Sequence, residues 1–266
     1  MLITLYKRNW KAHWKLLAAI QAVIALYFAV ITGMYDPADG SALKQLVAMK
    51  LPEAFIAAFG FSARDNSLLG FLASYLYGFL LLALPLIPII LLSNRLMAAL
   101  VDRGAMASLL SSAVTRRQVA LTQALFLISA VMAMALLTSA IGILMSEASF
   151  PGLLDQARFW RLNGGLFMAL LAVSAVCFFF SCLLNESRLF LPFGAGLPVM
   201  FLILRMLINY DPSLKALKWL TLFSLFVPAD FAGGSQVAGP VLILGAISLA
   251  LYAAGILVFD RKDLPL

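Results

Sequence analysis

The chain has 266 residues, of which 64% are hydrophobic and only 12% are charged, and its formal net charge is +7. Soluble domains carry about 25% charged residues, so this composition excludes an ordinary soluble domain and predicts an all-α integral membrane protein. The basic residues are scattered among the segments between apolar runs, which argues against a nucleic-acid partner.

Six apolar runs are long enough to cross a bilayer, which requires roughly 20 residues at about 1.5 Å per residue. They lie near residues 16–34, 68–92, 119–145, 166–184, 189–208 and 241–259. No convincing small-residue cleavage site closes the first run, so we expect it to be retained as a span. The sequence therefore predicts one transmembrane domain over residues 1–266, with six membrane-spanning helices.

Residues 1–15, MLITLYKRNWKAHWK, place aromatic and aliphatic side chains on one stripe and basic side chains on the neighbouring arc. This pattern predicts a short amphipathic helix that lies in the membrane interface before the first span. With both termini inside, most of the basic residues fall on inner segments, and the positive-inside rule then places both termini in the cytoplasm. These inner basic residues are Lys7, Arg8, Lys11, Lys15, Arg95, Arg103, Arg116, Arg117, Arg188, Arg261 and Lys262.

Prolines and glycines predict irregular helices in two spans. Pro85 and Pro88 fall in the inner half of the second span and predict a kink there. Two prolines and two glycines within residues 192–198 predict that the inner half of the fifth span is broken or strongly bent. The outer segment 209–239 contains leucines and a tryptophan that predict a further helix on the membrane surface.

Two polar side chains within or beside the spans are candidates for a transport pathway. Gln123 lies near the inner end of the third span, where we interpret it as a hydrogen-bonding contact between helices, with a substrate path as the alternative. Arg205 is the one ionisable residue within any predicted span and is a functional candidate for that reason. It lies within one turn of Asn209, so we expect its side chain to extend outward and anchor the span.

Residues 94–118 form the charged inner segment between the second and third spans. Its charged residues are Arg95, Asp102, Arg103, Arg116 and Arg117, and Gly104 follows Arg103. Between the charged parts of the segment, Leu109 and Leu110 recur at helical spacing with apolar residues at positions 106 and 114. The segment therefore predicts a short helix with one apolar side, suited to contact with another protein. The alternative is a loop whose arginines only determine topology.

The same segment resembles the signature found between the second and third spans of ABC-2 type permeases. The matching residues are Asp102-Arg103-Gly104, Leu109-Leu110-Ser111 and Val114-Thr115-Arg116, with Ala113 where the family usually has Pro and Thr115 where it has Ser. Shorter matches are the Pro-Glu of LPEAFIAAFGF, the Tyr-Leu-Tyr-Gly-Phe of the second span and the C-terminal tail. In that family this segment is the cytoplasmic coupling helix, which sits in a cleft of the ATP-hydrolysing subunit.

The resemblance implies the permease subunit of a bacterial ATP-binding cassette exporter. Such a subunit moves a hydrophobic or amphipathic substrate, such as a peptide, a drug or a lipid, across the plasma membrane. Its partners would be two copies of a cytoplasmic ABC ATPase subunit and a second permease, either a copy or a homologue. The residues expected to couple to the ATPase are Asp102, Arg103, Gly104, Leu109, Leu110, Arg116 and Arg117.

The chain has no Gly-x-x-x-x-Gly-Lys-Ser/Thr phosphate loop, so we expect no ATPase activity and no cofactor of its own. In the implied complex ATP and Mg would bind to the partner ATPase. A non-transporting membrane partner or sensor of an ATPase remains open as an alternative. A secondary carrier is a weaker alternative, because no carboxylate lies within a predicted span to bind a coupling ion.

Overall fold

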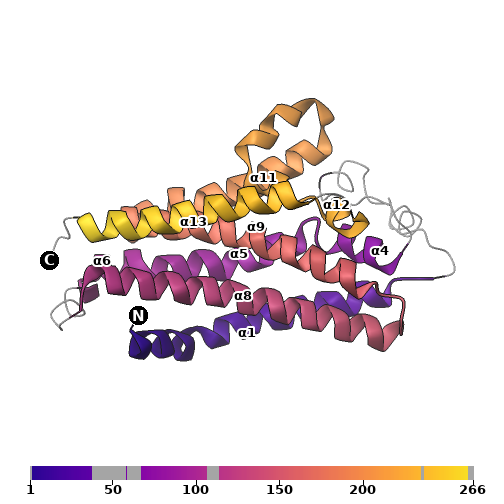
Figure 1. Cartoon of the computed structure of the whole chain (residues 1–266), viewed down its shortest axis with the longest axis horizontal. Helices are drawn as coiled ribbons and strands as arrows, with labels where there is room; N and C mark the ends of the chain where they lie inside the picture. Colours follow the sequence, from indigo (N-terminus) through magenta and orange to yellow (C-terminus); the bar gives the residue numbers. More distant parts are fainter. Residues whose placement is uncertain (1, 38–57, 59–66, 107–113, 235–236, 263–266) are drawn as a thin grey trace.

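The computed structural model describes residues 2–37, 58, 67–106, 114–234 and 237–262, and every regular element among them is helical. Six helices are long and apolar enough to cross a membrane. They are Ile3–Gly33, Leu80–Asp102, Arg116–Ser149, Gln156–Leu183, Ser187–Tyr210 and Ala238–Arg261. The first of these helices begins and the last of them ends at the same end of the bundle (Figure 1), which we name the terminal end. The opposite end is the distal end. This is the architecture of a multi-pass membrane protein.

The first helix, α1 (Ile3–Gly33), is continuous, although the sequence predicts a separate interfacial helix before the first span. The expected boundary near residue 15 is absent, because no glycine, proline or capping residue interrupts the sequence KAHWKLLAAI. A helix of 31 residues is about 46 Å long, whereas the apolar layer is about 30 Å thick. The basic first turns of α1 therefore belong to the same continuous helix as the span and extend beyond its apolar part.

The first turns of α1 pack against α8 (Arg116–Ser149), the third span. The amide of Leu2 donates to Oγ1 of Thr122 at 2.9 Å, and the hydroxyl of Tyr6 donates to Oγ of Ser129 at 2.9 Å. Phe126 of α8 meets the rings of both Tyr6 and Trp10 edge to face, while Trp14 is half exposed. Part of the aromatic stripe expected to face lipid therefore packs on protein.

The second span differs from its predicted limits at both ends. Its start is broken by a turn at residues 76–79, which separates α4 (Leu68–Tyr75) from α5 (Leu80–Ser93). Tyr77 is fully buried in this turn and donates its hydroxyl to Oδ1 of Asn163 at 3.0 Å. Pro85 and Pro88, expected to kink the inner half, lie inside α5. The helix continues past the predicted end through a π turn, η1 (Asn94–Ala98), into α6 (Ala99–Asp102).

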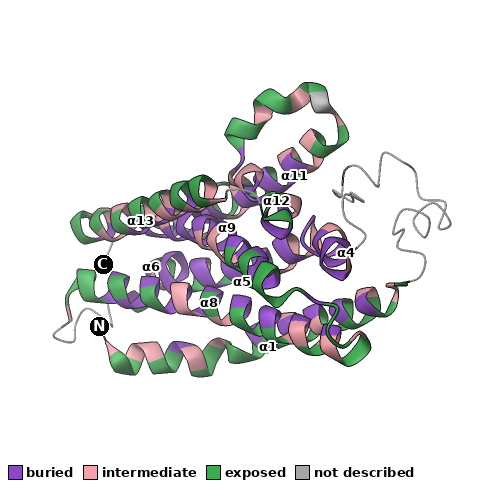
Figure 2. Ribbon diagram, turned by 45° about the vertical axis from the view of Figure 1, so that its right-hand side comes forward, coloured by how far each residue is buried: buried purple, intermediate pink, exposed green. Residues whose placement is uncertain are grey.

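The fourth span, α9 (Gln156–Leu183), is the most buried of the six and forms the centre of the bundle (Figure 2). It begins well before the predicted apolar run, because Asp155 caps its first turn by accepting from the Arg158 amide at 3.1 Å. Its longest contact is with α13 (Ala238–Arg261), the sixth span. Within that contact Ser174 and Tyr252 share a buried hydrogen bond of 2.8 Å.

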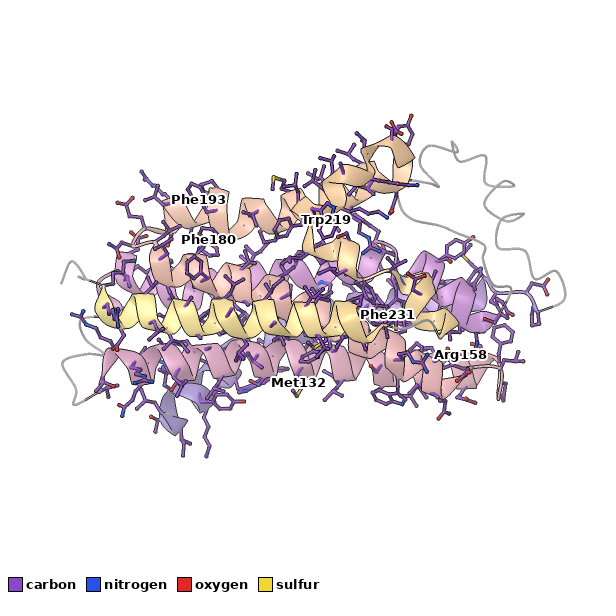
Figure 3. All side chains as sticks on the ribbon, turned by 45° about the horizontal axis from the view of Figure 1, so that its top comes forward. Met132, Arg158, Phe180, Phe193, Trp219 and Phe231 are labelled. Atoms are coloured by element: carbon purple, nitrogen blue, oxygen red, sulfur yellow. The ribbon has the colours of Figure 1, made fainter. Side chains whose placement is uncertain are left out.

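The fifth span is irregular in its first half, as its prolines and glycines predict. It consists of α10 (Ser187–Phe190), a π turn named η2 (Leu191–Ala195) and α11 (Gly196–Tyr210). The π turn leaves the Gly194 carbonyl to accept the thiol of Cys177 in α9 at 3.2 Å. Phe193 of η2 stacks on Phe180 of α9, with ring centroids 5.9 Å apart (Figure 3).

Beyond α11 the chain forms a compact surface region instead of the single surface helix that the sequence suggests. It contains two 3-10 helices, η3 (Pro212–Leu220) and η4 (Leu222–Leu225), and then α12 (Pro228–Gly233). Thr221 ends the first of these helices and begins the second, and its hydroxyl donates to the Phe201 carbonyl at 2.9 Å. The region is thus tied to α11 and projects to one side of the bundle (Figure 1).

Candidate functional site

The segment with the coupling-helix resemblance joins α6 to α8 at the terminal end of the bundle (Figure 1). The second span continues as helix through η1 and α6 to Asp102, and α8 starts at Arg116, so helices extend into both ends of the predicted segment. Leu109 and Leu110 lie outside the described residues. Of the two other apolar positions, Met106 is buried and Val114 is half-buried.

Gly104 ends the second span in a conformation that favours glycine. The Gly104 amide donates to the Val101 carbonyl at 2.9 Å, and the residue has a φ of 68°. This is the left-handed region, which glycine adopts without the steric cost that other residues incur. A Cβ atom added at Gly104 would contact nothing within 4 Å, so the requirement for glycine comes from the backbone and not from packing.

Asp102 and Arg103 are exposed at the end of α6. One Asp102 carboxylate oxygen, Oδ2, accepts from the amide of Ser187 at 3.4 Å. Ser187 begins α10, where the helix dipole favours a nearby negative charge. Asp102 therefore links the two connections at the terminal end, the one after the second span and the one before the fifth.

Arg116 and Arg117 are the first two residues of α8 and lie between Thr115 and Gln118, which form a capping box. The side chain of Arg116 is half-buried, and its Nη1 donates to the Lys262 carbonyl at 2.6 Å. The side chain of Arg117 is exposed. The two arginines thus have different surroundings, since Arg116 helps to hold the bundle together and Arg117 is free to meet a partner.

Lys262 is a structural residue of this end that sequence reasoning did not single out. Its Nζ donates to the carbonyls of Cys182 at 3.1 Å and Leu183 at 2.6 Å, which are C-terminal carbonyls of α9. These carbonyls have no partner within their own helix, and a cation suits the negative end of the helix dipole. Partial burial lowers the pKa of the Lys262 ammonium from its ordinary value. A basic residue immediately after the last span was the available signal.

Gln123 occupies a buried position between the first and third spans. Its Oε1 accepts a hydrogen bond of 2.6 Å from Nδ2 of Asn9, which is also buried. Farther along the same pair of helices, Gln21 donates to the Met134 carbonyl at 2.8 Å. Gln123 therefore takes part in the polar contact between α1 and α8, as its interpretation as an interhelical hydrogen-bonding residue predicts.

Arg205 is buried and does not reach solvent, which differs from the expectation that its side chain anchors the span at the surface. Its side chain is 8% exposed, and Nη1 donates to the carbonyls of Phe223 and Phe226, each at 2.6 Å. The guanidinium also lies 5.9 Å from the centroid of the Phe226 ring. The region after α11, from η3 to α12, packs against α11, and its carbonyls bind the guanidinium in place of water.

The predicted site residues therefore divide into three groups. The described part of the coupling segment, from Asp102 to Gly104 and from Arg116 to Arg117, comes together at the terminal end. Gln123 lies on the nearby contact between α1 and α8, and Arg205 lies beneath the region that follows α11. Compared with the models of known protein families, with curated proteins and with solved structures, the chain matches none.

Proposed function

We propose that this chain is the permease subunit of an ATP-binding cassette exporter in the bacterial plasma membrane, with both termini in the cytoplasm. It would move a hydrophobic or amphipathic substrate, a peptide, a drug or a lipid, with ATP hydrolysed by a separate subunit. One observation carries the proposal. The segment with the ABC-2 resemblance lies at the end of the bundle where α1 begins and α13 ends, so it is available to a partner on that side.

The helices around this segment support a mechanical role for it. Because the second span continues as helix to Asp102, a force applied near Gly104 would act directly on the span. At the same end, Asp102 connects the second span to the start of the fifth through Ser187. Lys262, which follows the sixth span, binds the end of the fourth span at Cys182 and Leu183. A partner that binds differently in two states would therefore act on several spans together.

The outer surface of the bundle supports assembly with a second permease. The fifth and sixth spans are the least buried of the six within the structure. The sixth span, α13, exposes Leu242, Ile243 and Leu249. Such apolar surface must be covered by lipid or by other helices. The proposed assembly has two permeases and two ATPase subunits, with ATP and Mg bound by the ATPases.

Charge reversal at Arg117 tests the proposal, because this residue is exposed and its side chain forms no hydrogen bond or ion pair with the described residues. The complex is purified from its native host through a tag on this chain and reconstituted into vesicles, and MgATP hydrolysis is measured with and without an amphipathic peptide. We expect hydrolysis that the peptide stimulates, and we expect Arg117→Glu to reduce the stimulation at least tenfold while membrane insertion stays normal. Arg116→Glu is less informative, since it also breaks the contact with Lys262.

Arg161→Glu is the matched control, because Arg161 is exposed on α9 toward the distal end and should leave stimulation unchanged. Absence of ATP hydrolysis in the purified complex would contradict the proposal. Hydrolysis that the peptide does not stimulate would favour the alternative of a non-transporting membrane partner. Unchanged stimulation in Arg117→Glu would remove the coupling role of this segment.

A further inference from the structure

A cavity of about 320 Å³ lies at the terminal end, between the first turns of α1, the η1–α6 segment and α8. Its volume is at the lower end of the range found for small-molecule sites, roughly 300–1,000 Å³. Its polar lining comes from three segments that are far apart in the sequence. The polar residues are Arg8, Asn9, His13, Arg95 and Gln123.

The charge of this lining has one sign. Arg8 comes from α1 and Arg95 from the π turn η1, and no carboxylate lines the cavity among the described residues. Two guanidinium groups facing one cavity repel each other, and a bound anion would turn that repulsion into attraction. The planar donor fork of arginine is suited to phosphate oxygens, which it can bind through two parallel hydrogen bonds.

Further hydrogen-bonding groups line the inner part of the cavity. Asn9 and Gln123 are buried, and Asn9 Nδ2 donates a hydrogen bond to Gln123 Oε1. The nitrogen of the Gln123 amide, Nε2, is left as a donor. His13 also lines the cavity, and its buried Nδ1 has no hydrogen-bond partner among the described residues. A buried polar atom without a partner calls for an explanation, and one explanation is a ligand or an ordered water.

The remaining walls are apolar, and the surroundings are those of a membrane interface. Leu5, Leu96 and Leu100 line the cavity beside the arginines. The exposed Lys7 and Lys11 on the same turns of α1, next to tryptophans, are typical of a helix at headgroup level. A ligand for this cavity would therefore combine a phosphate with an apolar attachment.

We propose that this cavity binds the phosphate of an anionic phospholipid headgroup, held by Arg8 and Arg95. The lipid would belong to the leaflet at the terminal end, and its apolar part would leave the cavity along the leucines. Bound there, it would join α1 to the foot of the second span, immediately before the segment that connects α6 to α8. The inference does not depend on the proposed export function, because it rests on the cavity alone.

Thermal unfolding of the purified chain in a non-ionic detergent tests the inference. Phosphatidylglycerol is titrated in one arm, phosphatidylcholine with the same acyl chains in a second, and inorganic phosphate in a third. We expect phosphatidylglycerol to raise the Tm in a saturable way. Phosphatidylcholine carries the same phosphate, but its choline ammonium cancels the negative charge and is repelled by the arginines, so this lipid should have little effect. Equal stabilisation by the two lipids would overturn the proposal. Stabilisation by inorganic phosphate but not by phosphatidylglycerol would support the phosphate site and assign it to a soluble ligand.

Substitutions show whether the effect arises in this cavity. Arg8→Gln and Arg95→Gln should each weaken phosphatidylglycerol binding roughly fivefold to tenfold, as expected for one basic residue at an anionic surface. Lys7→Gln and Arg188→Gln remove the same charge from exposed positions outside the cavity and should leave binding nearly unchanged. If all four variants weaken binding equally, the interaction is a general surface attraction and the proposal fails.

The lysine variants keep the test decisive if a glutamine variant does not fold. Arg8→Lys and Arg95→Lys preserve the charge but lose the planar fork, so binding should weaken less than in the glutamine variants. Unchanged binding in a folded Arg8→Gln or Arg95→Gln variant would overturn the proposal.

Discussion

At the scale of single residues, several polar side chains inside the bundle bind a partner from a distant segment. Tyr77 binds Asn163, Gln123 binds Asn9 and Ser174 binds Tyr252. In a bilayer an unpaired polar group has no water to bind, so such contacts hold specific pairs of helices in register. Arg205 follows the same rule, with backbone carbonyls as its acceptors.

We expect Arg205→Met to lower the stability of the protein by about 2–4 kcal/mol, because it leaves two buried carbonyls without a donor. The loss should appear as a lower Tm in detergent, and Arg205→Lys, which keeps a cationic donor, should lose less. Arg188→Met is the control, since Arg188 is exposed and its loss should change stability by no more than about 0.5 kcal/mol. Equal Tm values for Arg205→Met and Arg188→Met would show that the carbonyl contacts contribute nothing.

At the scale of helices, glycine allows close approach where aromatic rings cross α9. The ring of Phe231 from α12, whose position Figure 3 labels, would overlap a Cβ atom added at Gly165, and Cε2 of Phe226 would lie 2.9 Å from it. Both rings are buried and have little room to move. The neighbouring Gly164 is exposed, and a Cβ there would meet nothing within 4 Å.

We therefore expect Gly165→Ala to destabilise the protein by about 1–3 kcal/mol through overpacking against these rings. Gly164→Ala should be neutral or should stabilise by about 0.5–1 kcal/mol, because alanine favours the helix more than glycine does. The two variants share a helix and a chemical change, so their Tm difference isolates the packing against α12 and η4. Similar Tm values for both would contradict the packing of Phe226 and Phe231 on α9.

At the scale of the whole molecule, a group of basic residues and both ends of the described chain lie at the terminal end. Six crossings return the chain to its starting side, and the basic residues of α1, the α6–α8 connection and the end of α13 gather there. By the positive-inside rule, we expect that side to face the cytoplasm. In that orientation the region from η3 to α12, which exposes Trp219 almost completely, would face the outer side.

Labelling with a membrane-impermeant maleimide tests this orientation. In intact cells we expect Trp219→Cys to react and Lys7→Cys to stay unlabelled, and both should react after permeabilisation. Background should be low, because the native Cys177 and Cys182 are buried. Labelling of Lys7→Cys in intact cells would reverse the orientation, and the proposed contact with a cytoplasmic ATPase would then fail.

The sequence by itself determined the membrane class and the approximate positions of six spans. Hydropathy is a sum over neighbouring residues, so an apolar run such as residues 241–259 can be recognised without knowledge of its surroundings. The irregular fifth span was equally accessible, because its prolines and glycines act on their own backbone. The same local reasoning predicted a helix with one apolar side within residues 94–118, and the resemblance to ABC-2 type permeases suggested its coupling role. Its central Leu109 and Leu110 lie outside the described residues.

Only the tertiary structure decided which distant groups meet. The break before α5 depends on Tyr77 reaching Asn163, and the burial of Arg205 depends on carbonyls some 20 residues later in the chain. The role of Lys262 and the cavity between Arg8 and Arg95 likewise require helices to be placed side by side. Hydrogen bonds and charges act across space within a few ångströms, and sequence distance carries little information about which partners come within that range.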